Sequence, residues 1–179
     1  MRKLLLMVSL SLILVLLTGA CVLADSTIKV GYQFNGLYSV NGGITSDINP
    51  GATVGYEFTM KGENVEYGAG VEYQFEKDWK FTLNEQKFYF IPVFAVLNCP
   101  LSEHEYITAR LGYNFFDGNS AYKDGNTLNG GVYYAAGAGI NYSGFRMEIL
   151  YSCNNGSISG DNATDVKNAQ WAVNFGYRF

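Results

Sequence analysis

An alternation of period two, repeated along most of the chain after residue 25, most constrains what this sequence can fold into. The segment TIKVGYQFNGLYSV, which starts at Thr27, has an apolar and aromatic row on even positions that runs from Ile28 to Tyr38 and Val40, with mostly small or polar residues on the odd positions. Successive side chains of a β-strand point to opposite faces of the sheet. The pattern therefore predicts strands with one apolar face and one small or polar face, and almost no helix.

Eight segments have this pattern or a strand-like apolar run. We expect strands at residues 27–40, 52–60, 65–75, 87–98, 106–116, 131–142, 145–153 and 171–179. The segment 87–98 is apolar on both faces, so alternation does not fix its orientation. There we expect Phe88, Phe90, Phe94 and Val96 to point outward.

The connections between these segments alternate between short and long. The short ones are residues 61–64, 100–105 and 143–144, and the long ones, rich in Gly, Asn, Asp and Ser, are 41–49, 76–85, 117–129 and 154–169. Strands of about nine to eleven residues cross a bilayer at the usual tilt, and transmembrane barrels have short periplasmic turns and long outer loops. We expect both chain ends on the periplasmic side.

The glycines decide which face of the sheet meets lipid. Gly31, Gly55, Gly68, Gly112 and Gly176 all lie on the polar face of their segments. Small residues suit the narrow interior of an eight-stranded barrel, so the aromatic rows point outward, where water would make them an aggregation patch and lipid would solvate them. The expected fold is all-β, an eight-stranded antiparallel up-and-down transmembrane β-barrel, rather than a soluble carrier with an apolar pocket.

The first 24 residues read as a secretory signal peptide, with a basic start, an apolar run and small residues before Asp25. An uncleaved anchor and a lipoprotein signal ending at Cys21 are the alternatives. The barrel domain then comprises residues 25–179. We expect Cys99 at the periplasmic end of the barrel and Cys153 near its outer end, too far apart for a disulfide.

Seven charged residues share the inward face near the periplasmic end. They are Lys29, Glu57, Glu66, Arg110, Arg146, Glu148 and Arg178. Buried charges persist when they are paired, so these nearly balanced groups predict an ion-pair network that plugs the lumen. A constriction that selects ions, the alternative, would favour one sign of charge.

Composition excludes several other functions. The formal net charge is −4 for the whole chain, and the expected mature chain is more acidic still, which argues against a nucleic-acid partner. His104 is the only histidine and lies in a short turn, so we expect no nucleophile–histidine pair and no enzymatic activity. We also expect no cofactor and no metal site.

The signal peptide, the alternating strands, the glycine-rich lumen face and the aromatic final strand together resemble the opacity-protein and OmpA/OmpX-like group of small bacterial outer-membrane barrels. In the final strand Val173, Phe175, Tyr177 and Phe179 look like the targeting signal read by the barrel assembly machinery. The resemblance implies a monomer in outer-membrane lipid. It also implies a structural or adhesin-like role through the outer loops, with a narrow porin-like channel for small solutes as the alternative.

Three aromatic residues stand out in the long connections. Trp79 and Phe81 lie in the second, and Tyr122 lies in the third. They are candidate contacts for a host or surface ligand. Residues of the aromatic belt at the membrane interface are the alternative interpretation.

Overall fold

The computed structural model describes residues 24–40, 43–78, 87–123, 126–160 and 163–179. They form nine strands and one short helix. The elements are β1 (Ala24–Val40), β2 (Ile44–Ile48), β3 (Gly51–Lys61), β4 (Glu66–Lys77), β5 (Phe88–Pro100), β6 (Glu105–Gly118), α2 (Ser120–Lys123), β7 (Thr127–Tyr142), β8 (Phe145–Ser159) and β9 (Thr164–Arg178). Among the described residues no helix is long and apolar enough to cross a bilayer.

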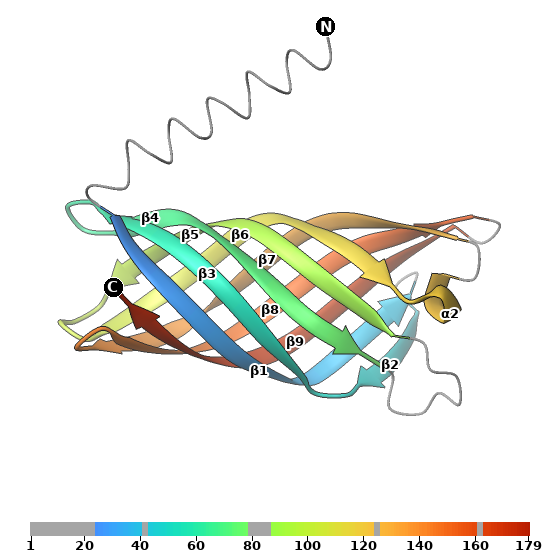
Figure 1. The fold of residues 1–179 in the computed structure, drawn as a ribbon, viewed down its shortest axis with the longest axis horizontal. Coiled ribbons are helices and arrows are strands. Elements are labelled where there is room, and N and C mark those ends of the chain that lie inside the picture. Colours follow the sequence, from blue (N-terminus) through green and yellow to red (C-terminus); the bar gives the residue numbers. More distant parts are fainter. Residues whose placement is uncertain (1–23, 41–42, 79–86, 124–125, 161–162) are drawn as a thin grey trace, which may run out of the picture.

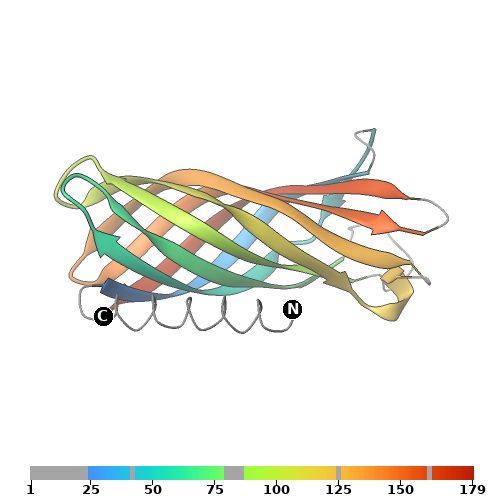
Figure 2. The ribbon, with the colours of Figure 1, turned by 90° about the horizontal axis from the view of Figure 1, so that it is seen from above.

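Eight of the strands close into a barrel. From β3 to β9 each strand pairs antiparallel with the next, and β1 pairs with both β3 and β9. The tilted strands wrap continuously around the barrel, and β9 runs beside β1 (Figures 1 and 2). β2 adds a short ninth strand by folding back on the far end of β1. The predicted fold, an eight-stranded antiparallel up-and-down barrel, is confirmed.

The two ends of the barrel differ. One end, here called the turn end, holds the short connections and both termini of the described chain, where the amide of Ser26 donates to the carbonyl of Phe179 at 3.1 Å. The Ser143–Gly144 turn at this end has positive φ at both residues, as a type I′ hairpin turn requires. The other end, the loop end, carries α2 and β2 (Figure 1).

The strands are longer than predicted at the loop end. β8 and β9 stay in register as far as the pair of Ile158 with Thr164. Residues 154–169, expected to be a long loop, are thus mostly a β-hairpin, and residues 44–48 of the first long connection form β2. Beyond lipid a strand needs no apolar row, so the alternation fades there while the backbone ladder continues.

An apolar belt surrounds the outside of the barrel. Its exposed members come from every barrel strand and include Ile28, Val30, Val54, Tyr56, Tyr67, Val71, Val93, Leu97, Ile107, Leu111, Val132, Ile140, Met147, Ile149 and Phe175. On β6 the belt runs from Ile107 to Phe115, which at about 3.3 Å per residue and about 40° tilt covers about 20 Å. That height is close to the apolar band of transmembrane barrels.

Aromatic side chains mark both edges of this belt. Tyr177 and Phe145 form an edge-on ring pair at the turn end, with centroids 5.2 Å apart. Toward the loop end Trp171 and Tyr151 form a second pair at 5.2 Å. These rings lie where the girdles of a transmembrane barrel meet the two membrane interfaces.

A bulge in β1 reverses the predicted facing of its last residues. Asn35 has a φ of 49°, and the register against β9 shifts between Phe34 and Leu37. Leu37 is consequently exposed, whereas Tyr38, expected outward, is buried in the lumen. Val40 packs against the same interior cluster. One inserted residue moves every later side chain to the opposite face.

The predicted orientation of β5 is wrong. Its buried side chains include Phe88, Phe90, Phe94 and Val96, all expected outward, while Val93 and Leu97 are exposed. The neighbouring strands explain this result. Phe94 lies opposite Gly70 on β4 and Gly112 on β6, and these two glycines leave room in the lumen for its ring.

Replacing Gly112 by alanine should therefore destabilise the barrel. A Cβ at this position would lie 2.0 Å from the Val93 carbonyl oxygen and 2.5 Å from the Phe94 Cα, so the backbone would have to move. We expect a loss of about 1–3 kcal/mol in the free energy of unfolding, measured by urea titration in detergent micelles. Gly43→Ala is the control, because a methyl group added there would have nothing within 4 Å. Equal stability of the two variants would contradict this packing.

Candidate functional site

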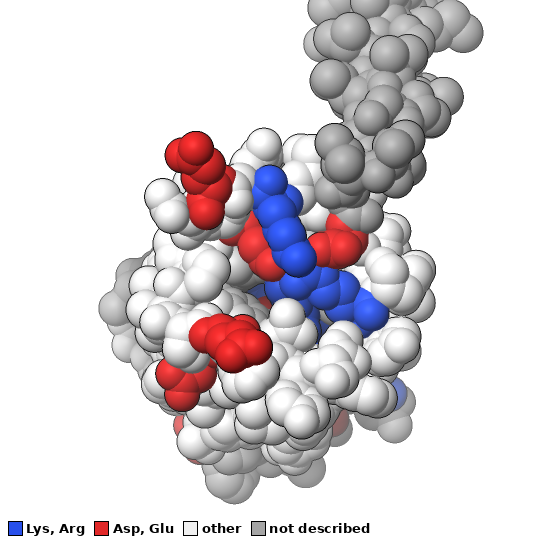
Figure 3. Space-filling model, turned by 90° about the vertical axis from the view of Figure 1, so that its left-hand side faces the viewer, with Lys and Arg blue, Asp and Glu red and all other residues white. Residues whose placement is uncertain are grey.

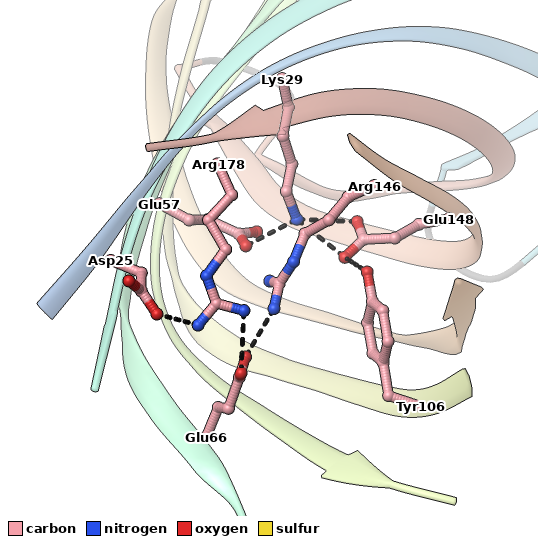
Figure 4. Close-up of polar contacts among 8 residues, drawn as sticks. All are labelled: Asp25, Lys29, Glu57, Glu66, Tyr106, Arg146, Glu148 and Arg178. Atoms are coloured by element: carbon pink, nitrogen blue, oxygen red, sulfur yellow. Dashed lines mark hydrogen bonds and ion pairs between the residues drawn. The ribbon is translucent and has the colours of Figure 1, made fainter. Parts of the chain in front are cut away.

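The lumen, viewed from the turn end, begins with a layer of alternating charges. Glu66 lies between two guanidinium groups, 2.5 Å from Arg146 Nη2 and 2.9 Å from Arg178 Nη1 (Figure 4). Arg178 also pairs with Asp25. In the surface view of this end, basic side chains occupy the centre of the mouth with acidic groups beside them (Figure 3). The layer holds two positive and two negative groups.

A second charged layer lies deeper in the lumen, and its four side chains form a closed square of ion pairs. Lys29 Nζ is 2.6 Å from Glu57 and 2.8 Å from Glu148, and Arg110 Nη2 is 2.7 Å from Glu57 and 2.6 Å from Glu148. All four side chains are at least 94% buried. The Tyr106 hydroxyl donates to Glu148 Oε1 at 2.8 Å (Figure 4). Each charge touches two of the opposite sign, so the square is neutral.

The seven charged residues singled out in the sequence thus all lie in these two layers, which sit one above the other. The square draws on β1, β3, β6 and β8, and among its ion pairs only that of Lys29 with Glu57 joins strands that share a backbone ladder. Sequence reasoning missed Asp25 and Tyr106. Tyr106 is on the inward row of β6, two residues before Thr108 and four before Arg110, so the alternation of that strand contained the signal.

Aromatic side chains fill the lumen above the square. The Arg110 guanidinium lies over the Phe94 ring, 5.2 Å from its centroid, and the Phe94 and Tyr133 rings are 5.4 Å apart. Both rings are almost fully buried. The two carboxylates contact one edge of the Arg110 guanidinium, and the Phe94 ring gives the flat face of that cation a favourable partner.

A polar layer follows, and its central residue was not predicted. The Lys77 ammonium donates to Gln33 Oε1 and to Gln170 Oε1, the latter at 2.5 Å, and Gln170 also donates to Gln74 Oε1 at 3.2 Å. By simple alternation Lys77 would share the outer face with Phe75. The register between β4 and β5 shifts after Gln74, which turns Lys77 into the lumen.

An apolar cluster closes the lumen at the loop end. Its buried members are Tyr38, Ile48, Phe88, Phe90, Phe116 and Val166. The Phe90 and Phe116 rings are stacked with centroids 4.7 Å apart, and Phe88 contacts Phe90 edge-on. Because β2 supplies Ile48, the folded-back strand seals the cluster. The interior thus contains, in order, two charged layers, an aromatic layer, a polar layer and this aromatic cap.

The remaining predicted residues lie elsewhere. Phe175, Tyr177 and Phe179 are exposed on the outer face of the final strand, with Val173 half-buried on the same row. Trp79 and Phe81 lie outside the described residues. Tyr122 belongs to α2, and its side chain is likewise outside the described part.

The remaining reactive groups are two cysteines and the single histidine. Cys99 and Cys153 are both free thiols. The His104 ring packs against Tyr142, with centroids 5.4 Å apart, in the turn between β5 and β6. Within the described ranges no three His, Cys, Asp or Glu side chains come together as a metal site.

Known structures place this architecture among membrane proteins. Neither a protein-family model nor a curated protein matches the sequence. The crystal structure of Ail, the attachment invasion locus protein of Yersinia pestis, is 18% identical and covers 88% of this chain and 99% of its own, with a TM-score of 0.56. The fold is that of the small outer-membrane β-barrels.

Two further structures agree. Neisserial surface protein A, NspA, is 13% identical over 87% of this chain and 99% of its own, with a TM-score of 0.56. Ail in complex with the heparin analogue sucrose octasulfate is 19% identical over 88% of this chain and 99% of its own, with a TM-score of 0.52. At such identities the likeness concerns the barrel fold alone.

Proposed function

We propose that this protein is an integral outer-membrane barrel with a structural and surface-interaction, adhesin-like role exercised through its loop end. The observation that carries the proposal is the filled lumen. Side chains cross it at every level from the Asp25–Arg178 pair to the aromatic cap. A ligand arriving from outside would therefore meet the loop-end surface and not an open passage.

The loop end has the features of a contact surface. The β8–β9 hairpin continues past the aromatic pair of Tyr151 and Trp171, and its outer row includes the charged residues Asp165 and Lys167. A groove of about 660 Å³ lies against this hairpin, lined by glycine backbone and by Ser39, Asn155, Asp165 and Lys167. A paired hairpin presents side chains with less loss of conformational entropy on binding than a free loop.

The similar structures fit this proposal without deciding it. Ail carries attachment in its name and was solved with a heparin analogue, and NspA is called a surface protein. One fold can carry many functions, and each depends on the residues placed on the barrel.

Trimming the β8–β9 hairpin tests the surface role. Residues 157–165 would be replaced by an Asn-Gly turn, which joins the registered pair Gly156 and Val166. We expect attachment of expressing bacteria to coated surfaces or host cells to fall about tenfold, because the contact surface is removed. The same bacteria should retain a barrel that migrates differently on gels before and after heating.

A matched control shortens the opposite end by replacing Ser102, Glu103 and His104 with two residues. Attachment should persist in this variant. Unchanged attachment after trimming of the β8–β9 hairpin, with the barrel still folded, would contradict the adhesin-like role. Protease treatment of intact cells, which should cut at the loop end and spare the turn end, tests the proposed periplasmic location of both termini.

A narrow solute channel is the competing proposal, and the polar layer around Lys77 favours it. The square of Lys29, Glu57, Arg110 and Glu148 argues against it, because a conducting path would have to separate ion pairs of 2.6–2.8 Å. We expect no discrete conductance when the purified protein is reconstituted in planar bilayers. Regular single-channel steps would favour the channel instead.

A further inference from the structure

A groove lies on the outer face of the barrel, at the turn-end edge of the apolar belt. Its volume is about 460 Å³, and it spans β7, β8 and β9. Ala138, on the outer row of β7, forms its floor together with the backbone of Gly139. Tyr106 and Glu148 border the floor from the lumen, where their side chains are buried. The walls are the apolar side chains of Leu101, Ile140, Met147, Ile149 and Val173.

The groove faces the hydrocarbon of the membrane, so an apolar chain has to cover it. Ile140, Met147 and Ile149 are each nearly half exposed and belong to the apolar belt. Three strands about 4.8 Å apart make a floor about 10 Å wide, which is room for a flexible hydrocarbon chain. Such a chain contacts the protein on several sides, whereas the convex surface elsewhere contacts it on one side only. The groove should therefore retain one chain longer than the rest of the belt does.

A carboxylate marks the turn-end rim of the groove. Glu105 is exposed and continues the outer row of β6, two residues before Ile107 of the belt. The exposed residues at the corresponding edge of β7 and β8 are aromatic, Tyr142 and Phe145. Glu105 accepts a hydrogen bond from Ser102 Oγ at 3.2 Å, and within the described part of the chain no lysine or arginine pairs with it. This anion favours a ligand that brings its own positive charge.

A second copy of the chain fits this face less well. Two barrels in one membrane have the same orientation, so a symmetric contact here would bring Glu103 and Glu105 of both copies together. Like charges that meet without a counter-ion destabilise an interface. The same two carboxylates disfavour an anionic lipid. A lipid with a cationic group in its head satisfies both the apolar groove and the acidic rim.

We propose that the groove binds one phospholipid with a primary ammonium head group, of the phosphatidylethanolamine type. One acyl chain lies over Ala138 between the apolar walls, and the ammonium donates to the Glu105 carboxylate. A primary ammonium makes charge-assisted hydrogen bonds that the quaternary ammonium of phosphatidylcholine cannot make, and phosphatidylglycerol has no cation. The site lies at the opposite end of the barrel from the surface proposed for attachment and does not depend on that role.

Native mass spectrometry of the purified barrel tests the proposal. The barrel is incubated in nonionic micelles with equimolar dioleoyl phosphatidylethanolamine, phosphatidylcholine and phosphatidylglycerol, whose chains are identical. We expect one retained lipid, with phosphatidylethanolamine favoured over phosphatidylcholine by about threefold to fivefold, as for one partly solvated ion pair. Phosphatidylglycerol should be retained least. Equal retention of the three lipids, or a preference for phosphatidylglycerol, would overturn the proposal. A dimer without retained lipid would overturn it as well and assign the groove to a second copy.

Two matched pairs of variants locate the site, all at exposed positions outside the lumen. Glu105→Gln removes the charge and can still accept from Ser102, so it should abolish the preference for phosphatidylethanolamine. Glu63→Gln, in another turn of the same end, should leave the preference unchanged. Ala138→Phe fills the floor and should reduce retention of all three lipids, whereas Ala95→Phe on the outer row of β5 should not. Wild-type selectivity in Glu105→Gln, or wild-type retention in Ala138→Phe, would refute the assignment.

Discussion

Replacing Arg110 by methionine will lower the free energy of unfolding of the barrel by about 3–5 kcal/mol. Arg110 is fully buried and pairs with both Glu57 and Glu148. Without it Lys29 faces two carboxylates, and one buried negative charge remains uncompensated. The loss should appear as a lower urea midpoint for the barrel refolded into lipid vesicles, with little change in the slope of the transition.

A second substitution separates charge balance from packing. In the double variant Arg110→Met and Glu57→Gln, the remaining pair of Lys29 and Glu148 is neutral, so at least half of the lost stability should return. A loss below about 1 kcal/mol for Arg110→Met alone would contradict the square as described, because that value is typical of solvated surface pairs. No recovery in the double variant would mean that Arg110 acts by filling space against Phe94.

Deleting Phe179 will reduce the amount of barrel assembled in the outer membrane several-fold. Phe179, the residue after β9, is exposed on the outside of the barrel, and its backbone exchanges two hydrogen bonds with Ser26 at 3.1 and 2.9 Å. Deletion removes the aromatic ring that we propose the assembly machinery recognises. It also removes the last backbone hydrogen bonds between the two ends of the chain. Quantifying the heat-modifiable band in outer-membrane fractions measures the effect.

Folding of the same variant from urea into micelles distinguishes the two causes, because no assembly machinery is present there. We expect near-normal folding in micelles and poor assembly in cells. Tyr142→Ala is the control, since Tyr142 is an equally exposed aromatic at the turn end of another strand. Normal assembly without Phe179 would refute the targeting role.

Alternation predicted the facing of the strands that have a single apolar row and an unbroken ladder. On β3, β6 and β9 every second side chain lies where the pattern placed it, because a strand with one lipid face and one lumen face has a single acceptable register. The seven lumen charges followed from the same rule. Their pairing in a closed square did not, since it depends on strands that are far apart in sequence.

Alternation did not predict the facing of Tyr38, Lys77 and the β5 phenylalanines. Tyr38 and Lys77 come after register shifts that follow Phe34 and Gln74, and these shifts turn both side chains into the lumen. The period-two pattern of the sequence does not show where such shifts occur. The orientation of β5 depends on partners, because Gly70 and Gly112 make space for Phe94 only once the strands are in register.

The seam between β1 and β9 has a consequence for the order of folding. Every other barrel pairing joins strands that are successive barrel strands along the chain, whereas the seam joins Thr27 to Arg178. Closing so long a loop carries the largest entropic cost in the molecule, although that cost rises only slowly with length. We expect hairpins from β3 to β9 to form first and ring closure to come last, because pairing between distant strands requires the loop to be closed beforehand. A barrel built in this way has one late step that depends on both ends of the chain being present.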